Sequence, residues 1–197
     1  MAYIGLRRPT IATVKTETPG QALEYNAGMR FGKAIAANVS WNRNENPLYA
    51  DDAIAENDNG ITGGTIEFNA DDLSAEERAY ALGLVEQTSG TVTSAVTTYQ
   101  TTDAAAPYVG FGYIRVRRKA GVTSFQGIWY HKVQFAEGSE NGQTKGQSIE
   151  WQTPTINGTI MGVQIDSSGA IHFREEQHFD TEAAAATWLD GKAGISA

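Results

Sequence analysis

The clearest pattern in the chain is an alternation of large and small side chains over residues 31–41. One set of alternate positions is mostly bulky and consists of Phe31, Lys33, Ile35, Ala37, Val39 and Trp41. The other set is small and consists of Gly32, Ala34, Ala36, Asn38 and Ser40. A period of two predicts a β-strand with two different faces. The small face indicates either close packing beneath a helix or a wall that faces a passage.

Similar patterns predict further strands along the chain. They cover residues 61–69, 108–118, 122–135, 147–153, 155–165 and 170–179. The second and third of these form a hairpin across residues 119–121, and a turn at residues 166–169 separates the last two. Residues 137–146 are polar and glycine-rich, which predicts a turn, and residues 88–106 have the composition of a weak strand or a loop.

Two helices are predicted from their capping residues. Ser74 and Glu77 form a capping box at the start of a helix over residues 74–87. A second helix is capped at residues 180–182, runs through Leu189 and stops near Gly191. The predicted fold is therefore mainly β, a β-sandwich or partly open barrel of two packed antiparallel sheets with two short α-helices.

Composition narrows the class of protein. A length of 197 residues is typical of a single domain, here residues 1–197, and the absence of cysteine excludes disulfides and thiolate chemistry. Residues 1–9 have no long apolar stretch after their charges, so we expect neither a signal peptide nor membrane insertion. The formal charge of −8 argues against a protein that holds nucleic acid tightly.

A long connection, residues 42–60, separates the predicted strands 31–41 and 61–69. It carries one base and five acids, and thus half of the net charge of the chain. Connections longer than about 12–15 residues without secondary structure are usually functional or disordered. Apolar residues at the centre of this one argue against disorder. We therefore predict a loop that docks onto a partner through Pro47, Leu48, Tyr49, Asp51, Asp52 and Ile54.

No arrangement of residues suggests catalysis. The three histidines, His131, His172 and His178, are too scattered for a metal site, and we expect surface or strand residues. The acids Asp51, Asp52, Glu56 and Asp58 leave open a weak cation site as an alternative to a solvated acidic loop. Because no nucleophile, base and orienting group converge, we expect neither an enzyme nor a cofactor.

Two further groups of residues leave alternatives open. The one basic cluster consists of Arg115, Arg117, Arg118 and Lys119. No aromatic residues alternate with it, which favours an inter-subunit salt-bridge edge over a nucleic-acid site. The four tryptophans, Trp41, Trp129, Trp151 and Trp188, could form the stacking surface of a monomeric carbohydrate-binding module. Their positions in predicted strands and a helix are more typical of core residues.

Several short motifs together resemble the major tail proteins of long-tailed, non-contractile bacteriophages. They are Ile4-Gly5-Leu6-Arg7-Arg8-Pro9, Gly32-Lys33-Ala34-Ile35, Leu48-Tyr49-Ala50-Asp51, Tyr108-Val109-Gly110-Phe111-Gly112-Tyr113 and Thr144-Lys145-Gly146-Gln147-Ser148-Ile149. The resemblance spans most of the chain, in order. Some relatives carry an added immunoglobulin-like domain at the C-terminus, and we expect none in this chain.

The resemblance implies a tail tube subunit of the virion, made in the cytoplasm of the bacterial host. Such subunits form hexameric rings that stack into a hollow tube, with other tail proteins at its ends and with double-stranded DNA passing through without sequence-specific binding. The long loop would reach the neighbouring ring. The predicted lumen-facing residues are Ala34, Ala36, Asn38 and Ser40. An acidic wall would repel phosphates, so DNA could slide. A secretion-system tube protein of the same fold is an alternative.

Overall fold

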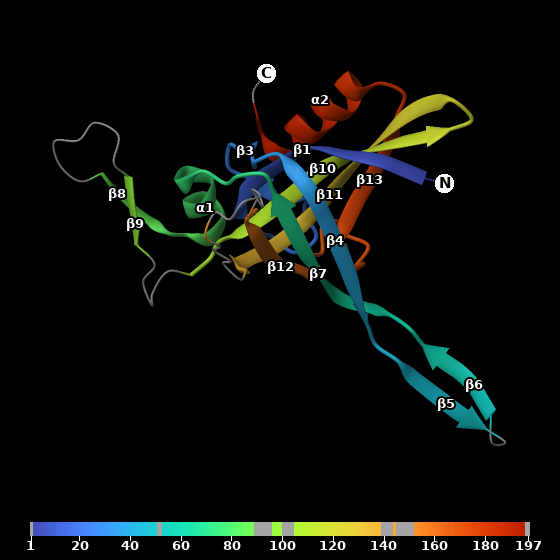
Figure 1. Cartoon of the computed structure of the whole chain (residues 1–197). Helices are drawn as coiled ribbons and strands as arrows, with labels where there is room; N and C mark the ends of the chain where they lie inside the picture. Colours follow the sequence, from blue (N-terminus) through green and yellow to red (C-terminus); the bar gives the residue numbers. More distant parts are fainter. Residues whose placement is uncertain are drawn as a thin grey trace.

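The computed structural model describes residues 2–50, 53–88, 96–99, 105–138, 144 and 152–195. Within them, a β body carries two helices and two projecting hairpins (Figure 1). The strands are β1 (Ala2–Thr16), β2 (Glu24–Tyr25), β3 (Met29–Arg30), β4 (Ala34–Arg43), β5 (Asn46–Ala50), β6 (Ala53–Asp58), β7 (Ile61–Ala70), β8 (Val85–Thr88), β9 (Val96–Tyr99), β10 (Tyr108–Lys119), β11 (Val122–Glu137), β12 (Thr155–Met161) and β13 (Arg174–Phe179). The helices are α1 (Ala75–Leu82) and α2 (Glu182–Ala193). The predicted mainly β fold with two short helices is confirmed.

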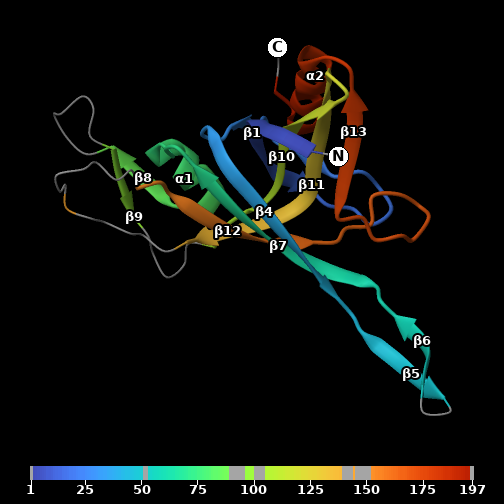
Figure 2. The same ribbon diagram turned by 45° about the vertical axis from the view of Figure 1, so that its right-hand side comes forward.

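Nine strands of the described chain form one antiparallel sheet. Its order is β2-β1-β10-β11-β12-β7-β4, with β3 beside β1 and β13 beside β11. The sheet curls, so that the half made of β4, β7 and β12 packs over the half made of β1, β10 and β11 (Figure 2). β3 leads into β4, and the N–H of Phe31 donates to the carbonyl of Pro9 at 3.0 Å. The two predicted layers are therefore two halves of one sheet, which forms a partly open barrel.

The interior of the barrel is filled by aromatic rings from both halves of the sheet. Phe31, Phe68, Phe111 and Phe135 are buried there, with ring centroids of contacting pairs between 5.2 and 6.2 Å apart. Such pairs contribute about 0.5–1.5 kcal/mol each beyond the burial of their area. Helix α1 adds Leu82 to the same core.

Helix α2 covers the opposite face of β1, β10 and β11. Ile114 and Trp129 alternate along their strands with the barrel-core residues and pack with Leu189 of α2 in a second core. The helix begins at Thr181, whose hydroxyl accepts a hydrogen bond from the N–H of Ala184 at 3.3 Å. Neither of the two described helices covers the outer face of β4, β7 and β12 (Figures 1 and 2).

The ends of both helices differ from the prediction. The predicted helix 74–87 stops at residue 82, because Gly83 adopts a left-handed conformation with φ of 68° and donates its N–H to the carbonyl of Ala79. The next residues form β8 instead. In α2, the helix continues through Gly191 and ends before Gly194, which has φ of 64°. No helix in the described part of the chain is long and apolar enough to cross a membrane.

The start of β4 also differs from the predicted strand 31–41. The register of β4 against β7 shifts between Ala34 and Ala36, which marks a β-bulge. A bulge reverses the side to which later residues point. Ala34 therefore packs on the barrel core and Ile35 is 55% exposed, the reverse of the predicted assignment. Beyond the bulge the predicted core face is confirmed at Ala37, Val39 and Trp41.

The predicted hairpin of residues 108–118 and 122–135 is confirmed as β10 and β11. Its turn is formed by Ala120 and Gly121, with φ of 48° and 82°, the positive values that a tight two-residue hairpin turn requires. The hairpin is long, because β11 continues to residue 137 and pairs with β13 at one end and β12 at the other.

The later predicted strands are shorter or lie elsewhere. Strand 155–165 is observed as β12, and strand 170–179 as β13 preceded by an isolated bridge between Val163 and His172. Most of the predicted strand 147–153 and of the predicted turn 137–146 lies outside the described residues.

Packing of α2 gives a stability prediction. We expect Leu189→Ala to lower the free energy of unfolding by about 2–5 kcal/mol, because Leu189 is fully buried between α2 and the sheet. Urea unfolding followed by tryptophan fluorescence measures this loss. As a control, Ile171→Ala truncates a side chain that is 56% exposed and should change stability by less than about 1 kcal/mol. Equal losses in both variants would contradict the second core.

Candidate assembly surfaces

The outer face of β4, β7 and β12 is a solvent-exposed polar surface that we call the polar sheet face. The register places Asn38 opposite Glu67, and Glu67 opposite Asn157, across three adjacent strands. The neighbouring row consists of Ser40, Thr65 and Thr159. All six side chains are exposed, and both rows line a hollow in the sheet surface. Such a sheet face, polar and uncovered, is available to line a passage or to contact another molecule.

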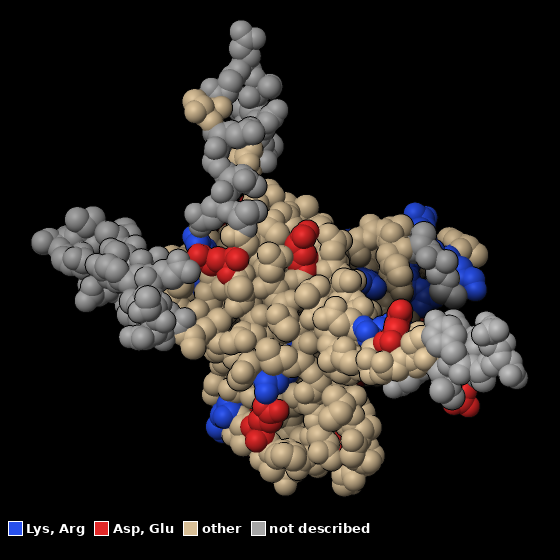
Figure 3. Space-filling model, turned by 90° about the horizontal axis from the view of Figure 1, so that it is seen from below, with Lys and Arg blue, Asp and Glu red and all other residues tan. Residues whose placement is uncertain are grey.

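The polar sheet face is almost uncharged. In the described segments that form it, residues 36–40, 65–69 and 155–159, the single charged residue is Glu67. Seen from below, the charged groups on the body are scattered among uncharged surface (Figure 3). The acidic wall expected from the net charge is therefore not what this face presents, because Glu67 is its single acid in the described residues.

Three of the four predicted lumen-facing residues lie on the polar sheet face. Asn38 and Ser40 are exposed there, and Ala36 shares their side because it pairs with Asn69. Ala34 does not, because the bulge turns it onto the barrel core. The alternative that this face packs beneath a helix is wrong for the helices in the described chain.

Strands β4 and β7 continue beyond the barrel into a projecting hairpin formed by β5 and β6 (Figures 1 and 2). The predicted loop 42–60 is therefore mostly β-structure, which corrects its expected form. At its root the N–H of Asn44 donates to the carbonyl of Gly60 at 2.8 Å. Within the described residues, no hydrogen bond or ion pair joins β5 or β6 to the body. We call residues 44–60 the arm.

Four of the six predicted docking residues lie on the two strands of the arm. Pro47 is exposed on β5. The backbones of Leu48 and Tyr49 belong to β5 and that of Ile54 to β6, where Tyr49 pairs with Ile54, but their side chains are not described. Asp51 and Asp52 lie outside the described residues. Docking through these residues stays a prediction.

A second hairpin, β8 and β9, projects on the other side of the body (Figure 1). It pairs Val85 with Tyr99 and Thr88 with Val96. The low-complexity composition of residues 88–106 predicts only a weak strand or a loop. The signal that identifies the strand is the run of β-branched and aromatic residues over 96–99.

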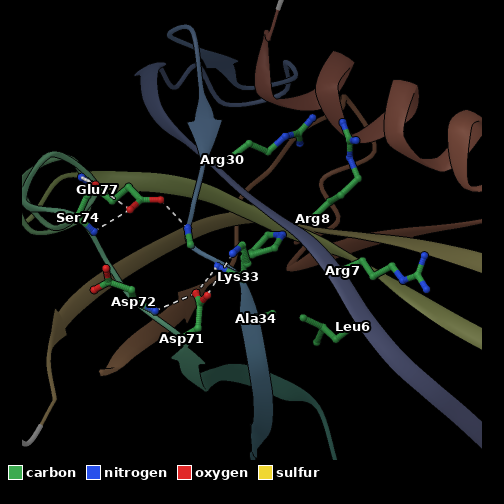
Figure 4. Close-up of a pocket in the computed structure, with 12 residues that line it drawn as sticks. Leu6, Arg7, Arg8, Arg30, Lys33, Ala34, Asp71, Asp72, Ser74 and Glu77 are labelled. Atoms are coloured by element: carbon green, nitrogen blue, oxygen red, sulfur yellow. Dashed lines mark hydrogen bonds and ion pairs between the residues drawn. The ribbon is translucent and has the colours of Figure 1, made fainter. Parts of the chain in front are cut away.

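A cavity lies between β1 and the start of β4, where the barrel is open (Figure 4). The N–H of Gly32 donates to Glu77 at 2.6 Å, and Glu77 also accepts from the N–H of Ser74, which confirms the predicted capping box. The N–H of Lys33 donates to Asp71 at 3.0 Å. This hydrogen bond is the main reason why the pKa of Asp71 lies below its usual value. These contacts fix the loop that leads into β4.

Two arginines of the cavity wall extend towards α2 (Figure 4). Asp190 accepts from Arg8 at 3.1 Å and from Arg30 at 2.5 Å, and Arg30 also donates to Thr10 at 2.7 Å. The cavity is therefore a seam of the barrel held by internal ion pairs. Beside it, β4 is the last strand of the sheet, and within the described chain it pairs with β7 alone.

The basic cluster divides into two pairs of residues. Arg115 lies over the rings of Tyr3 and Tyr113, 5.2 and 5.6 Å from their centroids, and Arg117 lies 3.4 Å from the Nδ1 of His178. The other two cations, Arg118 and Lys119, are exposed at the end of the β10–β11 hairpin. We call residues 118–122 the tip.

The histidines lie in three different environments. His131 lies in β11, in agreement with the expected strand position, and is buried there, which lowers its pKa to about 4. His172 is half-buried and His178 is exposed on β13. In the described residues, no group of three or more His, Asp or Glu could hold a metal ion. Asp51 and Asp52 of the candidate cation site lie outside those residues.

The tryptophans that the structure describes serve the two cores. Trp129 is fully buried beside α2, and Trp188 packs on Phe179 with ring centroids 5.9 Å apart. Trp41 is half-buried and packs on the barrel core, and Trp151 lies outside the described residues. These positions give no open row of indole rings for carbohydrate stacking in the described chain.

Comparison with known proteins does not identify a family. No protein-family model matches the sequence, and no curated protein matches it. The assignment of a function therefore rests on the surfaces described above and on the motif resemblance.

Burial of His131 gives a pH prediction. The folded pKa of about 4 lies below the usual 6.5, so between these values the unfolded chain binds more protons than the folded one. Stability should be highest above pH 6.5 and fall towards pH 4, by on the order of 3 kcal/mol. In urea unfolding at several pH values, His131→Gln should flatten this dependence. His178→Gln, at an exposed position, should leave it unchanged; the opposite ranking would refute the role of His131.

Proposed function

We propose that the chain is the major tail tube subunit of a long-tailed, non-contractile bacteriophage. In this proposal six copies form a ring, and the rings stack into the tube of the virion through which double-stranded DNA leaves the capsid. Other tail proteins bind the tube ends. The observation that carries the proposal is that one pair of strands, β4 and β7, forms both an uncovered polar sheet face and a projecting arm.

The arm supports stacking because it needs a partner. A two-stranded hairpin on its own is at best marginally stable in water. The arm has no hydrogen bond to its own body within the described residues, and Glu45, Pro47 and Glu56 on it are exposed. A hairpin of this kind is stabilised when it lies on another surface, and a neighbouring ring provides one.

The free edge of β4 supports ring closure. Exposed strand edges are normally protected by lysine, proline or a covering segment. The ten residues of β4 contain neither lysine nor proline, and Ile35 on this strand is 55% exposed. Pairing of this edge with a neighbouring copy would remove it from solvent and continue the polar sheet face from subunit to subunit. A barrel of many strands leaves an aqueous channel.

The composition of the polar sheet face suits the passage of DNA. Its exposed residues are hydroxyl and amide side chains with the single carboxylate of Glu67, and no Lys or Arg occurs in described residues 36–40, 65–69 and 155–159. Affinity for DNA comes largely from cations that displace counterions from phosphates. A wall without cations lets the duplex move without being held.

Of two other functions, one would use the same surfaces and the other has less support from the structure. A secretion-system tube protein would use the same surfaces, and it differs in what passes through the tube rather than in the subunit. A carbohydrate-binding module would use exposed tryptophans, but Trp129 is buried and Trp41 packs on the core. Electron micrographs of the purified protein separate the classes, because rings or tubes support a tube protein and persistent monomers contradict it.

Deletion of the arm tests its role in stacking. Removal of residues 46–58 joins Glu45 to Asn59 and leaves a short turn between β4 and β7. Because no described hydrogen bond joins the deleted strands to the body, we expect an unchanged circular dichroism spectrum and a melting temperature within a few degrees. In negative-stain micrographs we expect rings but no tubes.

A variant of the same length tests whether stacking needs the paired strands of the arm or only a segment of that length. Replacement of residues 46–58 by thirteen Gly and Ser residues keeps the length but not the β5–β6 pairing, and it should also fail to stack. Long tubes from the deletion variant would show that the arm is dispensable for stacking.

Added cations test whether the polar sheet face lines the lumen. Thr65→Lys and Thr159→Lys together place two lysines per subunit on this face. Tubes of this variant, assembled with short DNA duplexes, should retain DNA in a salt-dependent way and protect it from nuclease, whereas wild-type tubes should retain little. A nuclease-protection assay on pelleted tubes measures the difference.

The control places two lysines elsewhere. Ser168→Lys and Gln177→Lys lie at exposed positions outside the polar sheet face. DNA held by these tubes should be digested. If the Thr65 and Thr159 variant binds DNA that nuclease digests, the polar sheet face lies outside the lumen.

A further inference from the structure

The tip of the β10–β11 hairpin is an exposed cationic surface. Arg118 and Lys119 are exposed, and neither makes an ion pair within the described part of the chain. Val122, on the same tip, is 68% exposed. A hollow beside the tip is lined by Lys119, Val122, His178 and the acid Asp180, among others. The tip thus combines positive charge, an apolar side chain and a concave surface.

The arm has the complementary composition. It carries five acids and no base. Two of these acids, Glu45 and Glu56, are exposed, and neither has an ion pair within the described residues. Pro47 gives the arm an exposed apolar side chain beside them. A negative, partly apolar hairpin and a positive, partly apolar hairpin are suited to bind each other.

The arm and the tip cannot meet within one molecule. They leave the body at opposite ends, the arm at the lower end and the tip at the upper end of both ribbon views (Figures 1 and 2). A contact between two different surfaces of identical subunits is heterologous. Such contacts form a closed ring when the rotation from one subunit to the next closes, and an open, repeating assembly when it does not.

We propose that the acceptor for the arm is the cationic tip of another copy of this chain, so that the acids of each arm bind Arg118 and Lys119 of a subunit in the next ring. This inference rests on the proposed function and adds to it the surface on which the arm docks. The opposite charges of the arm and the tip also determine the direction of stacking, because two arms repel each other and two tips repel each other.

Cross-linking tests the contact directly. The chain has no cysteine, so Glu56→Cys with Lys119→Cys in one chain introduces the only two thiols. A flexible bifunctional thiol-reactive cross-linker should convert this protein into a ladder of linked subunits on a denaturing gel. The matched control combines Glu56→Cys with Lys15→Cys, whose side chain is 60% exposed, and should give no ladder. A ladder in the control alone, or in neither variant, overturns the proposal.

Charge reversal tests the electrostatic origin of the contact. Arg118→Glu with Lys119→Glu should raise the protein concentration needed for tube formation at least about tenfold, and adding Glu45→Lys with Glu56→Lys should restore assembly. Wild-type assembly should weaken as salt rises. The control Lys15→Glu with Arg7→Glu makes the same change of charge at exposed positions and should assemble as wild type does.

The outcomes distinguish the inference from the proposed function. Wild-type protein that forms neither rings nor tubes contradicts the function, whereas the cross-linking ladder can still be measured between copies in solution. Wild-type tubes together with unchanged assembly of the Arg118 and Lys119 variant contradict the inference and leave the function standing.

Discussion

The rest of the structure depends on the packing of Trp129 against two glycines of β10. A Cβ atom at Gly110 would lie 2.2 Å from the indole, and one at Gly112 would lie 2.6 Å from it. No other residue fits at either position. Between the two glycines, Phe111 points into the barrel core, so one short segment supplies space for the second core and an aromatic ring for the first. β10 and β11 are therefore packed on both faces, by the barrel and by α2.

This double burial determines which surface is left for function. The barrel core and α2 stabilise the half of the sheet made of β1, β10 and β11 on both sides. The half made of β4, β7 and β12 is buried on one side only, and its other side is polar and uncovered by the described helices. The same strands carry the free edge and the arm. The half that is buried on both sides is thus not the half that carries the polar sheet face, the free edge and the arm.

Sequence patterns identify the parts of this fold in which local and tertiary preferences agree. The β10–β11 hairpin and the capping box at Ser74 are examples. The longest early strand, β1, escapes the pattern because Arg7-Arg8-Pro9 interrupts its alternation. A β-bulge accommodates that interruption, with φ of 53° at Arg8. The reversed side-chain orientation at the start of β4 also escapes the sequence pattern. A β-bulge causes it, and a bulge is determined by pairing with a strand that is distant in the sequence.

The charge and the length of the arm could be predicted from the sequence, but its β-hairpin structure could not. The sequence of the arm reads as a loop because its asparagines and paired acids disfavour strands, and only the continuation of β4 and β7 imposes β-pairing on it. The continuation of β4 and β7 therefore determines that the arm, which carries the acids, projects away from the body. In the proposed assembly, the acids of the arm would repel the arms of other free subunits, which would disfavour symmetric arm-to-arm dimers. The proposed contact between arm and tip joins two different surfaces, and contacts of that kind extend an assembly in one direction.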